Sequence, residues 1–347
     1  MKKSIVLTGG GTAGHIMPNI ALLDKLKENF ENIYYIGTNG MEKEICNKND
    51  INFYEISAPK FVRKLSFKTL SIPFKLIKSI HQCKQILKQI KPDVIFSKGG
   101  YVSIPVCIAG KKLNIPVISH ESDLSIGLAN KIILKYSNVL CTSFKETANY
   151  NKKCVYTGSP IRQDIFNGNK KNVLEKFNYD KNKPTILFIG GSLGSTAINN
   201  IVYENIDKLA SIYNVLHISG KHGKPLTHNG YYQVSFSDKI QDFFAACDIC
   251  ISRSGANTIF ELASLQKLML LIPLPKGNSR GDQVENALNF KNNNLANVLM
   301  QEDLDINNLL KQIDKTFKQK DYFISNMQKL DLKNANNKIL KIILNQM

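Results

Sequence analysis

The chain has 347 residues, of which 43% are hydrophobic and 21% are charged. This length and composition exclude a small disulfide-stapled fold and a collagen-like repeat, and they favour two globular domains. The 46 Lys and Arg residues outnumber the 28 Asp and Glu residues, which gives a formal net charge of +18. So basic a chain is expected to meet an anionic partner: nucleic acid, a phosphorylated small molecule or an acidic membrane surface.

The first residues, MKKSIVLT, hold too short an apolar run for a signal peptide and predict a β-strand instead. The sequence contains no window close to the roughly 18 apolar residues that span a bilayer. Seven cysteines, an odd number, are typical of a reducing compartment. Cys247 and Cys250 form a C-x-x-C, but their apolar surroundings indicate a buried strand, and the histidines lack zinc-ligand spacing. We therefore expect a cytoplasmic protein that uses no metal and no cofactor.

Short apolar runs alternate with amphipathic helical segments, a pattern typical of βαβ units and parallel sheets. The expected strands are Ser4–Thr8, Ile33–Gly37, Val94–Ser97, Val117–Ser119, Val139–Thr142, Cys154–Tyr156, Thr185–Ile189, Val215–Ser219, Ile249–Ser252 and Leu268–Ile272. A polar stretch at residues 163–183 separates two similar halves. The sequence thus predicts an α/β protein with two Rossmann-like domains, 1–162 and 163–324, and a C-terminal helix at about 325–347 that packs back on the first domain.

The first half opens with Gly9, Gly11 and Gly14 in G-x-G-x-x-G spacing, between a strand and a helix with Pro18 in its first turn. Such a loop binds anions, because the amides at a helix N-terminus lack backbone partners. A dinucleotide enzyme normally carries an acidic residue at the end of the second strand. Here that strand ends in Gly37 and Thr38, which disfavours NAD.

The second half repeats the glycine loop at residues 190–194, so we expect a ligand in the cleft between the two domains. A further turn at Arg253–Gly255 follows a strand, and Asn257 or Thr258 is placed to cap the next helix. Glu261 then falls in that helix's first turn, where it either pairs with the helix dipole or accepts the hydroxyls of a ribose. Both alternatives remain open on the residues alone.

Another helix start, after a loop rich in Pro and Gly, carries Asp282, Gln283 and Asn286. Side chains in such a position commonly face a cleft.

Seven motifs occur in order along most of the chain. They are GGGTAGH (9–15), KGGYVSIP (98–105), HESDLSIGLANK (120–131), TGSPIR (157–162), GGSLGSTAIN (190–199), SRSGANTIFEL (252–262) and DQVENA (282–287). Together they resemble the MurG family of bacterial glycosyltransferases, and seven spaced motifs are far more specific than one glycine loop. The resemblance implies the GT-B fold, with the donor in the C-terminal domain and the lipid acceptor toward the N-terminal one.

The same resemblance implies transfer of N-acetylglucosamine (GlcNAc) from UDP-GlcNAc to the C4 hydroxyl of undecaprenyl-pyrophosphoryl-N-acetylmuramyl-pentapeptide (lipid I), with inversion, to give lipid II. That reaction belongs to peptidoglycan synthesis, and so to cell shape and division. The implied partners are UDP-GlcNAc, lipid I, an anionic membrane surface and cell-wall synthesis proteins, without nucleic acid. The implied place is the cytoplasmic face of the cell membrane, as a peripheral protein.

Residues that match the family's motifs receive roles from the resemblance. The loop from Thr12 approaches the donor, amides near Ser192 face the diphosphate, and Glu261 holds the ribose. The implied substrate-binding residues are Thr12, Ala13, Gly14, Asp123, Arg162, Ser192, Asn199, Ser237, Ala256, Asn257, Thr258, Ile259, Phe260, Glu261 and Gln283. At the position before Gln283 this sequence has Asp282, where members of the family often have a second glutamine.

Inverting transfer needs a group that takes the proton of the attacking hydroxyl. We rank His15 first, Asp123 second and Glu121 third. His15 stands at a helix start, where it could instead act only as a cap. Asp123 stands where other members carry asparagine, so that only here is it able to act as a base.

No acidic residue occurs between Glu55 and Asp93, although nine Lys and Arg residues do. Within this run Leu70, Phe74, Ile77 and Ile80 recur at helical spacing, and Lys75 and Lys78 lie on other faces. The pattern fits a helix that faces the core, and it also fits a helix that docks on an anionic membrane, with these six residues as the docking set.

Two rival functions remain open. A UDP-GlcNAc 2-epimerase would share the fold and the donor but not the lipid acceptor, and KGGYVSIP and HESD argue against it. A basic nucleic-acid-binding protein would need aromatic or arginine-rich readout, whereas here the excess is mostly lysine and Trp is absent.

Overall fold

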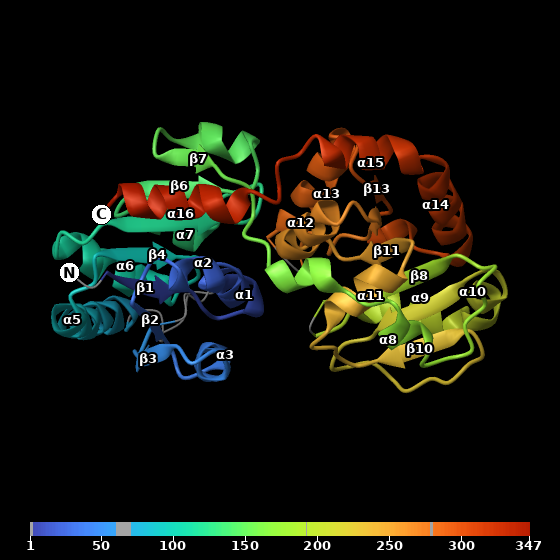
Figure 1. The fold of residues 1–347 in the computed structure, drawn as a ribbon, viewed down its shortest axis with the longest axis horizontal. Coiled ribbons are helices and arrows are strands. Elements are labelled where there is room, and N and C mark those ends of the chain that lie inside the picture. Colours follow the sequence, from blue (N-terminus) through green and yellow to red (C-terminus); the bar gives the residue numbers. More distant parts are fainter. Residues whose placement is uncertain (1–2, 60–70, 192, 278–279) are drawn as a thin grey trace. The chain divides into compact units, whose positions relative to one another are not determined.

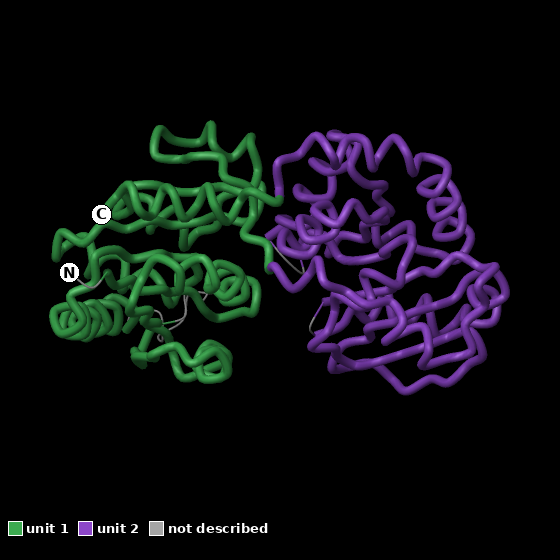
Figure 2. Tube along the Cα trace, in the orientation of Figure 1, with its two compact units in different colours: residues 1–162, 333–347 green, residues 163–332 purple. Residues whose placement is uncertain are grey.

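The computed structural model describes residues 3–59, 71–191, 193–277 and 280–347. The chain forms two compact units (Figure 2). Unit 1 comprises Met1–Arg162 and Lys333–Met347, and unit 2 comprises Gln163–Leu332. The chain therefore returns to unit 1 at Lys333 rather than at about residue 325, because the last helix before that point packs on unit 2.

Unit 1 is built on a parallel sheet of seven strands in the order β3-β2-β1-β4-β5-β6-β7 (Figure 1). Its strands are β1 (Ser4–Thr8), β2 (Asn32–Gly37), β3 (Asn52–Glu55), β4 (Val94–Ser97), β5 (Val117–Glu121), β6 (Val139–Thr142) and β7 (Cys154–Tyr156). Its helices are α1 (Ala13–Ala21), α2 (Leu23–Lys27), α3 (Met41–Lys48), α5 (Ile72–Ile90), α6 (Ser103–Lys112), α7 (Leu128–Ile133), η1 (Glu146–Tyr150) and α16 (Ala335–Asn345).

Unit 2 has a parallel sheet of six strands in the order β10-β9-β8-β11-β12-β13. Its strands are β8 (Thr185–Ile189), β9 (Asn214–Ile218), β10 (Tyr231–Val234), β11 (Ile249–Ser252), β12 (Leu268–Leu271) and β13 (Asn297–Val298). Its helices are η2 (Gln163–Asn167), α8 (Lys171–Leu174), α9 (Thr196–Glu204), α10 (Ile206–Ile212), α11 (Ile240–Ala246), α12 (Ala256–Ser264), α13 (Asp282–Asn292), η3 (Gln301–Asp303), α14 (Ile306–Lys318) and α15 (Lys320–Gln328).

Both sheets reverse their strand order at the same place. The first strand of each unit lies between the second and the fourth, so that β1 adjoins β4 and β8 adjoins β11. In doubly wound sheets, ligands bind in the crevice beyond the carboxyl ends of the strands at this reversal. The topology therefore predicts that ligands bind at the loops after β1 and β4 in unit 1, and at the loops after β8 and β11 in unit 2.

The C-terminal segment is part of the core of unit 1. In α16, Ile339 and Ile343 are fully buried in the hydrophobic cluster that contains Ile5 and Leu7 of β1. By contrast, α15 buries Phe323 and contacts β12 of unit 2. The single C-terminal helix expected from the sequence is thus two helices, and each one belongs to a different unit.

Asn336, in the first turn of α16, ties the returning segment to unit 1. Its amide oxygen accepts a hydrogen bond from the Ile161 backbone N–H (3.0 Å), and its amide nitrogen donates to the carbonyls of Ile161 (2.8 Å) and Ala21 (2.9 Å). The side chain is only 3% exposed. A single asparagine thus satisfies buried backbone groups from two other segments.

We expect Asn336→Ala to lower the free energy of unfolding by about 2 to 4 kcal/mol, because it leaves buried backbone groups without partners. Urea unfolding measures the change. The matched control is Asn337→Ala, which alters an exposed neighbour and should cost no more than about 0.5 kcal/mol. Equal losses in the two variants would contradict the structural role of Asn336.

Candidate active site

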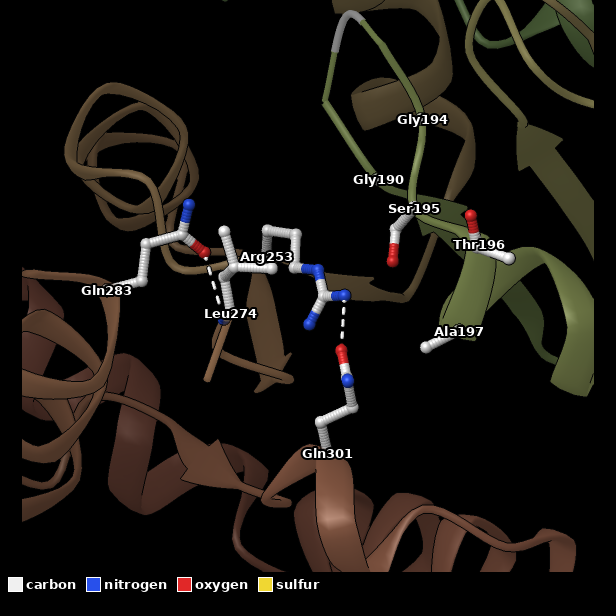
Figure 3. A pocket seen from close by; sticks show the side chains of 9 residues that line it. All are labelled: Gly190, Gly194, Ser195, Thr196, Ala197, Arg253, Leu274, Gln283 and Gln301. Carbon is white, nitrogen blue, oxygen red and sulfur yellow. Dashed lines mark hydrogen bonds between the residues drawn. The ribbon is translucent and has the colours of Figure 1, made fainter. Parts of the chain in front are cut away.

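A pocket of about 320 Å³ lies at the reversal point of the unit 2 sheet (Figure 3). It is lined by residues from the loops after β8, β11 and β12 and from the starts of the helices α9, α13 and η3. These residues are Gly190, Gly194, Ser195, Thr196, Ala197, Arg253, Leu274, Gln283 and Gln301. The polar lining and the helix start at Thr196 suit an anionic ligand.

The glycine loop of this pocket is held by contact with a second turn. Gly194 has φ +84°, and a Cβ there would lie 2.2 Å from the carbonyl oxygen of Ser219. Gly220 is equally restricted, since its Cβ would lie 2.1 Å from the Gly194 nitrogen. Beyond the loop, the Ser195 hydroxyl accepts a hydrogen bond from the Ile198 N–H and caps α9. These contacts hold Gly194 and the start of α9 in place. Ser192, expected here, lies outside the described residues.

Asn199 points away from the pocket, into a buried polar network. Its amide nitrogen donates to the Ser219 carbonyl (2.9 Å), and its amide oxygen accepts from His217 Nε2 (3.0 Å). His217 Nδ1 in turn lies 2.8 Å from the Tyr231 hydroxyl. Asn199 is 3% exposed, so its contacts hold the turn that supports the glycine loop.

Arg253 is a pocket residue that the sequence marked only as part of a turn. Its Nη1 donates to the carbonyls of Ile272 and Pro273 (3.0 Å each), and its Nη2 donates to the Gln301 side chain (2.5 Å). Figure 3 shows the guanidinium reaching into the pocket from the end of β11. Although burial lowers its pKa, an arginine stays charged at neutral pH. The sequence feature that could have identified Arg253 as a pocket residue is its position directly after the fourth strand of a Rossmann-like sheet.

The segment 256–261 divides between core and surface. Because α12 begins at Ala256 with Gly255 as its N-cap, Asn257 and Thr258 lie inside the helix and Glu261 falls in its second turn, not its first. The buried members are Ala256, Ile259 and Phe260. Asn257, Thr258 and Glu261 are half-buried, so these three are the members able to face a ligand.

The neighbouring helix α13 is joined to the Arg253 turn. The Ser254 hydroxyl donates to the Gln283 carbonyl (2.7 Å), and Asn286 donates to the Ser254 carbonyl (3.2 Å). The Gln283 side chain lines the pocket and accepts from the Leu274 N–H (3.1 Å). Asp282 lies 3.6 Å from the Arg280 guanidinium.

Ser237 lies in the loop after β10, where its hydroxyl accepts from the Lys239 N–H (3.1 Å). The neighbouring Phe236 ring is 62% exposed.

In unit 1 the loops after β1 and β4 touch. Gly100 has φ +81°, and a Cβ there would lie 2.4 Å from the Gly10 carbonyl oxygen and 3.4 Å from His15 Nδ1. His15 is half-buried in the first turn of α1, and its Nδ1 lies 3.0 Å from the hydroxyl of Thr12, the N-cap residue. Ala13 and Gly14 open the helix, so Pro18 lies inside it rather than in its first turn as expected.

Glu121 and Asp123 differ sharply in their surroundings. The Glu121 carboxylate is 5% exposed and accepts hydrogen bonds from the N–H groups of Asp123 (3.0 Å) and Gly127 (2.9 Å) and from the Asn130 side chain (3.0 Å). Burial raises the pKa of Glu121, and these bonds oppose the rise. Asp123 is half-buried, as is Arg162 at the end of unit 1. The geometry therefore uses Glu121 to shape the loop that presents Asp123.

The long helix α5 carries two apolar surfaces. Its inner face packs on the core through half-buried and buried residues, among them Leu76, Ile80, Cys83 and Leu87. Phe74 and Ile77 are 76% and 65% exposed, and Lys75 and Lys78 are exposed beside them. Ile80 thus belongs to the core face, while Leu70 lies outside the described residues. The helical spacing of apolar residues alone does not tell which of two apolar surfaces on one helix faces the core.

In the described part of the chain, no helix is long and apolar enough to cross a membrane. The same residues contain no cluster of three or more His, Cys, Asp or Glu side chains that could hold a metal ion. Cys247 and Cys250 are both buried free thiols.

Two doubly wound α/β units, one of them with a polar pocket where its strand order reverses, define a two-domain protein of the GT-B fold class. Residues 5–141 match the glycosyltransferase family 28 N-terminal domain, and residues 185–342 match the family 28 C-terminal domain. The chain belongs to glycosyltransferase family 28.

Two clostridial relatives match almost the whole chain. A protein of Clostridium tetani is 43% identical over 350 residues, and one of Clostridium botulinum strain Alaska E43 is 45% identical; both matches cover 99% of this chain and 98% of the relative. Both relatives are named UDP-N-acetylglucosamine:N-acetylmuramyl-(pentapeptide) pyrophosphoryl-undecaprenol N-acetylglucosamine transferase.

Solved structures share the fold. The crystal structure of MurG from Acinetobacter baumannii superposes with a TM-score of 0.77 at 24% identity, over 99% of this chain and 100% of that one. A UDP-GlcNAc 2-epimerase from Neisseria meningitidis gives a TM-score of 0.66 at 14% identity, over 99% of this chain and 100% of that one. At these identities the comparison establishes architecture.

The His217 network makes stability depend on pH. Burial lowers the pKa of His217 from 6.5 to about 4, so between these values the unfolded chain binds a proton that the folded one does not. As the pH falls from 6.5 to about 4, this group therefore lowers the free energy of unfolding by up to about 3 kcal/mol. Above this range it has no such effect. We expect His217→Gln to remove this part of the pH dependence in urea unfolding. His222→Gln, at an exposed position, should leave the pH dependence unchanged.

Proposed function

We propose that this protein transfers GlcNAc from UDP-GlcNAc to the C4 hydroxyl of lipid I, with inversion, in peptidoglycan synthesis. The observation that carries the proposal is the full-length match, at 43% identity, to transferases named for that reaction. In this assignment the donor belongs to unit 2 and the acceptor to unit 1.

The pocket of unit 2 supports the donor assignment. Cleavage of the sugar bond places negative charge on the departing diphosphate, and fixed dipoles and cations stabilise such charge. The amides at the start of α9 and the Arg253 guanidinium supply both at one place. Glu261 and Gln283 are assigned to the ribose and to the sugar.

The loops of unit 1 supply the candidates for the proton acceptor. His15 and Asp123 are half-buried, whereas the oxygens of Glu121 already accept three hydrogen bonds. We therefore assign the base to His15, with Asp123 as the alternative, and give Glu121 the role of shaping the loop. Such a base contributes about 10²- to 10⁴-fold to the rate.

Transfer is tested with radiolabelled UDP-GlcNAc and a water-soluble lipid I analogue. We expect label in the product only when both substrates are present. Conversion of UDP-GlcNAc to its 2-epimer without acceptor would favour the epimerase, and no product above a boiled control, with the fold intact, would overturn the proposal.

Glu261→Ala tests the donor site. Removing a charged hydrogen-bond partner of the ribose should raise the KM for UDP-GlcNAc by about 10- to 100-fold. The matched control is Glu175→Ala, at an exposed position of unit 2, whose KM should stay within about twofold. An unchanged donor KM in Glu261→Ala would remove Glu261 from the site.

The exposed group Phe74, Lys75, Ile77 and Lys78 on α5 supports peripheral docking on an anionic membrane. Apolar side chains enter the headgroup region while lysines contact anionic lipids, each worth about 1 kcal/mol. A lipid-anchored acceptor requires such an approach, so we place the enzyme at the cytoplasmic face of the cell membrane.

We expect Lys75→Glu with Lys78→Glu to weaken binding to phosphatidylglycerol-containing vesicles by at least about 30-fold, because two attractions are removed and two repulsions are added. Affinity for UDP should not change. Lys311→Glu with Lys315→Glu, on α14 of unit 2, makes the same change in net charge at another exposed place. Equal weakening by both pairs would show that only net charge matters.

A further inference from the structure

Lys98 is a buried cation that the proposed reaction leaves without a role. It follows β4 directly and is 2% exposed. Its ammonium lies 2.6 Å from His120 Nδ1 and also donates to the Ser122 hydroxyl. A charge is costly to bury, so its partners must compensate for lost water.

The hydrogen bonds of His120 fix the direction of this contact. His120 Nε2 lies 3.0 Å from the Gly158 carbonyl, which only accepts, so Nε2 carries the proton. Nδ1 is then an acceptor, and the Lys98 ammonium is its donor. Burial and the nearby ammonium lower the pKa of His120 well below its usual range, which keeps the ring neutral.

The charged form of Lys98 is opposed by burial and supported by acidic neighbours. Burial lowers the pKa of the ammonium, and Glu121 of β5, Asp123 of the following loop and Cys141 of β6 partly oppose this, so that the pKa is about 8. The titratable groups that face Lys98 are these three and His120. Lys98 is therefore mostly protonated at neutral pH and begins to lose its proton in mildly alkaline solution.

The partners of Lys98 come from segments that surround the acceptor-side loops. Ser122 begins the loop that Glu121 shapes and that presents Asp123. Gly158 belongs to the segment that leads out of unit 1, and a Cβ there would lie 3.1 Å from the Ala335 side chain. The ammonium thus joins the end of β4, the loop after β5 and the segment after β7.

The same position in unit 2 holds Arg253. Lys98 follows Ser97 at the end of β4, and Arg253 follows Ser252 at the end of β11; both strands are fourth in their sheets and adjoin the first. Arg253 reaches into its pocket, whereas Lys98 turns into the protein. At equivalent positions, unit 2 therefore has a cation that lines its pocket and unit 1 has a cation that is buried.

We propose that Lys98 is a positioning residue for the acceptor: through His120 and Ser122, its ammonium holds the 122–127 loop in the conformation that binds lipid I. This inference rests on the proposed function, because it takes unit 1 as the acceptor side. Lys98 itself does not touch the substrate.

The test is Lys98→Met, which keeps a long buried side chain and removes the donor. We expect the KM for the soluble lipid I analogue to rise at least tenfold, and the KM for UDP-GlcNAc to stay within twofold. In the wild type, the acceptor KM should also rise above about pH 8, and this rise should be absent in Lys98→Met. Lys111→Met, at an exposed position of unit 1, is the matched control and should keep both KM values and the pH profile.

Equal changes in both KM values, or an alkaline rise that persists in Lys98→Met, would overturn the proposal. If Lys98→Met does not fold, Ser122→Ala removes one partner and should raise the acceptor KM about threefold without changing the donor KM; no change there would also overturn it.

A readout without turnover separates this inference from the proposed function. In ¹⁵N-histidine NMR spectra, the His120 Nδ1 resonance should shift in Lys98→Met and in the wild type above about pH 8, but not in Lys111→Met. An Nδ1 resonance that ignores both changes would overturn the Lys98 contact. Absence of transfer by a wild type that shows these shifts would overturn the proposed function instead.

Discussion

The reversal of strand order in each sheet is the constraint on which the rest of this molecule depends. Where β1 adjoins β4 and β8 adjoins β11, the helical connections leave in opposite directions, and the carboxyl ends of the strands border a crevice. The glycine loops, the cations Lys98 and Arg253, and the starts of α1 and α9 all stand at these two places. Anionic groups are expected to bind there because the backbone amides at the helix starts have no partners within their helices.

Each glycine loop is supported by a buried polar network from equivalent positions. In unit 1, Asn19 donates to the Thr8 carbonyl (3.2 Å) and the Tyr35 hydroxyl donates to the Gly9 carbonyl (2.7 Å). In unit 2, Asn199 and His217 hold the turn at Ser219. Tyr35 and His217 occupy matching places, each paired with the first strand of its sheet, at Leu7 and Phe188. Because buried polar groups are costly when unpaired, these networks hold the backbone in place at Thr8, Gly9 and Ser219.

The strands could be predicted well and the helix ends less well. Most central strands are fully buried apolar runs, such as Val94–Ser97 and Ile249–Ser252, and these lie where the sequence placed them. The strands that were missed, β3, β10 and β13, lie at or next to sheet edges and are partly polar or very short. The helices α1 and α12 begin earlier than expected, because Thr12 and Gly255 take extended N-cap conformations, although neither residue makes a side-chain hydrogen bond to the backbone of its helix.

The sequence by itself determined the two Rossmann-like halves, the glycine loops and the family, because apolar periodicity and ordered motifs are local properties of the chain. Only the tertiary structure decided which side chains turn inward: Glu121, Asn199 and Lys98 are buried with partners, whereas Phe74 and Ile77 are exposed. A residue's type and spacing do not identify the hydrogen-bond partners that offset the cost of removing a buried polar group from water. Those partners come from strands and loops distant in sequence, which only the fold brings together.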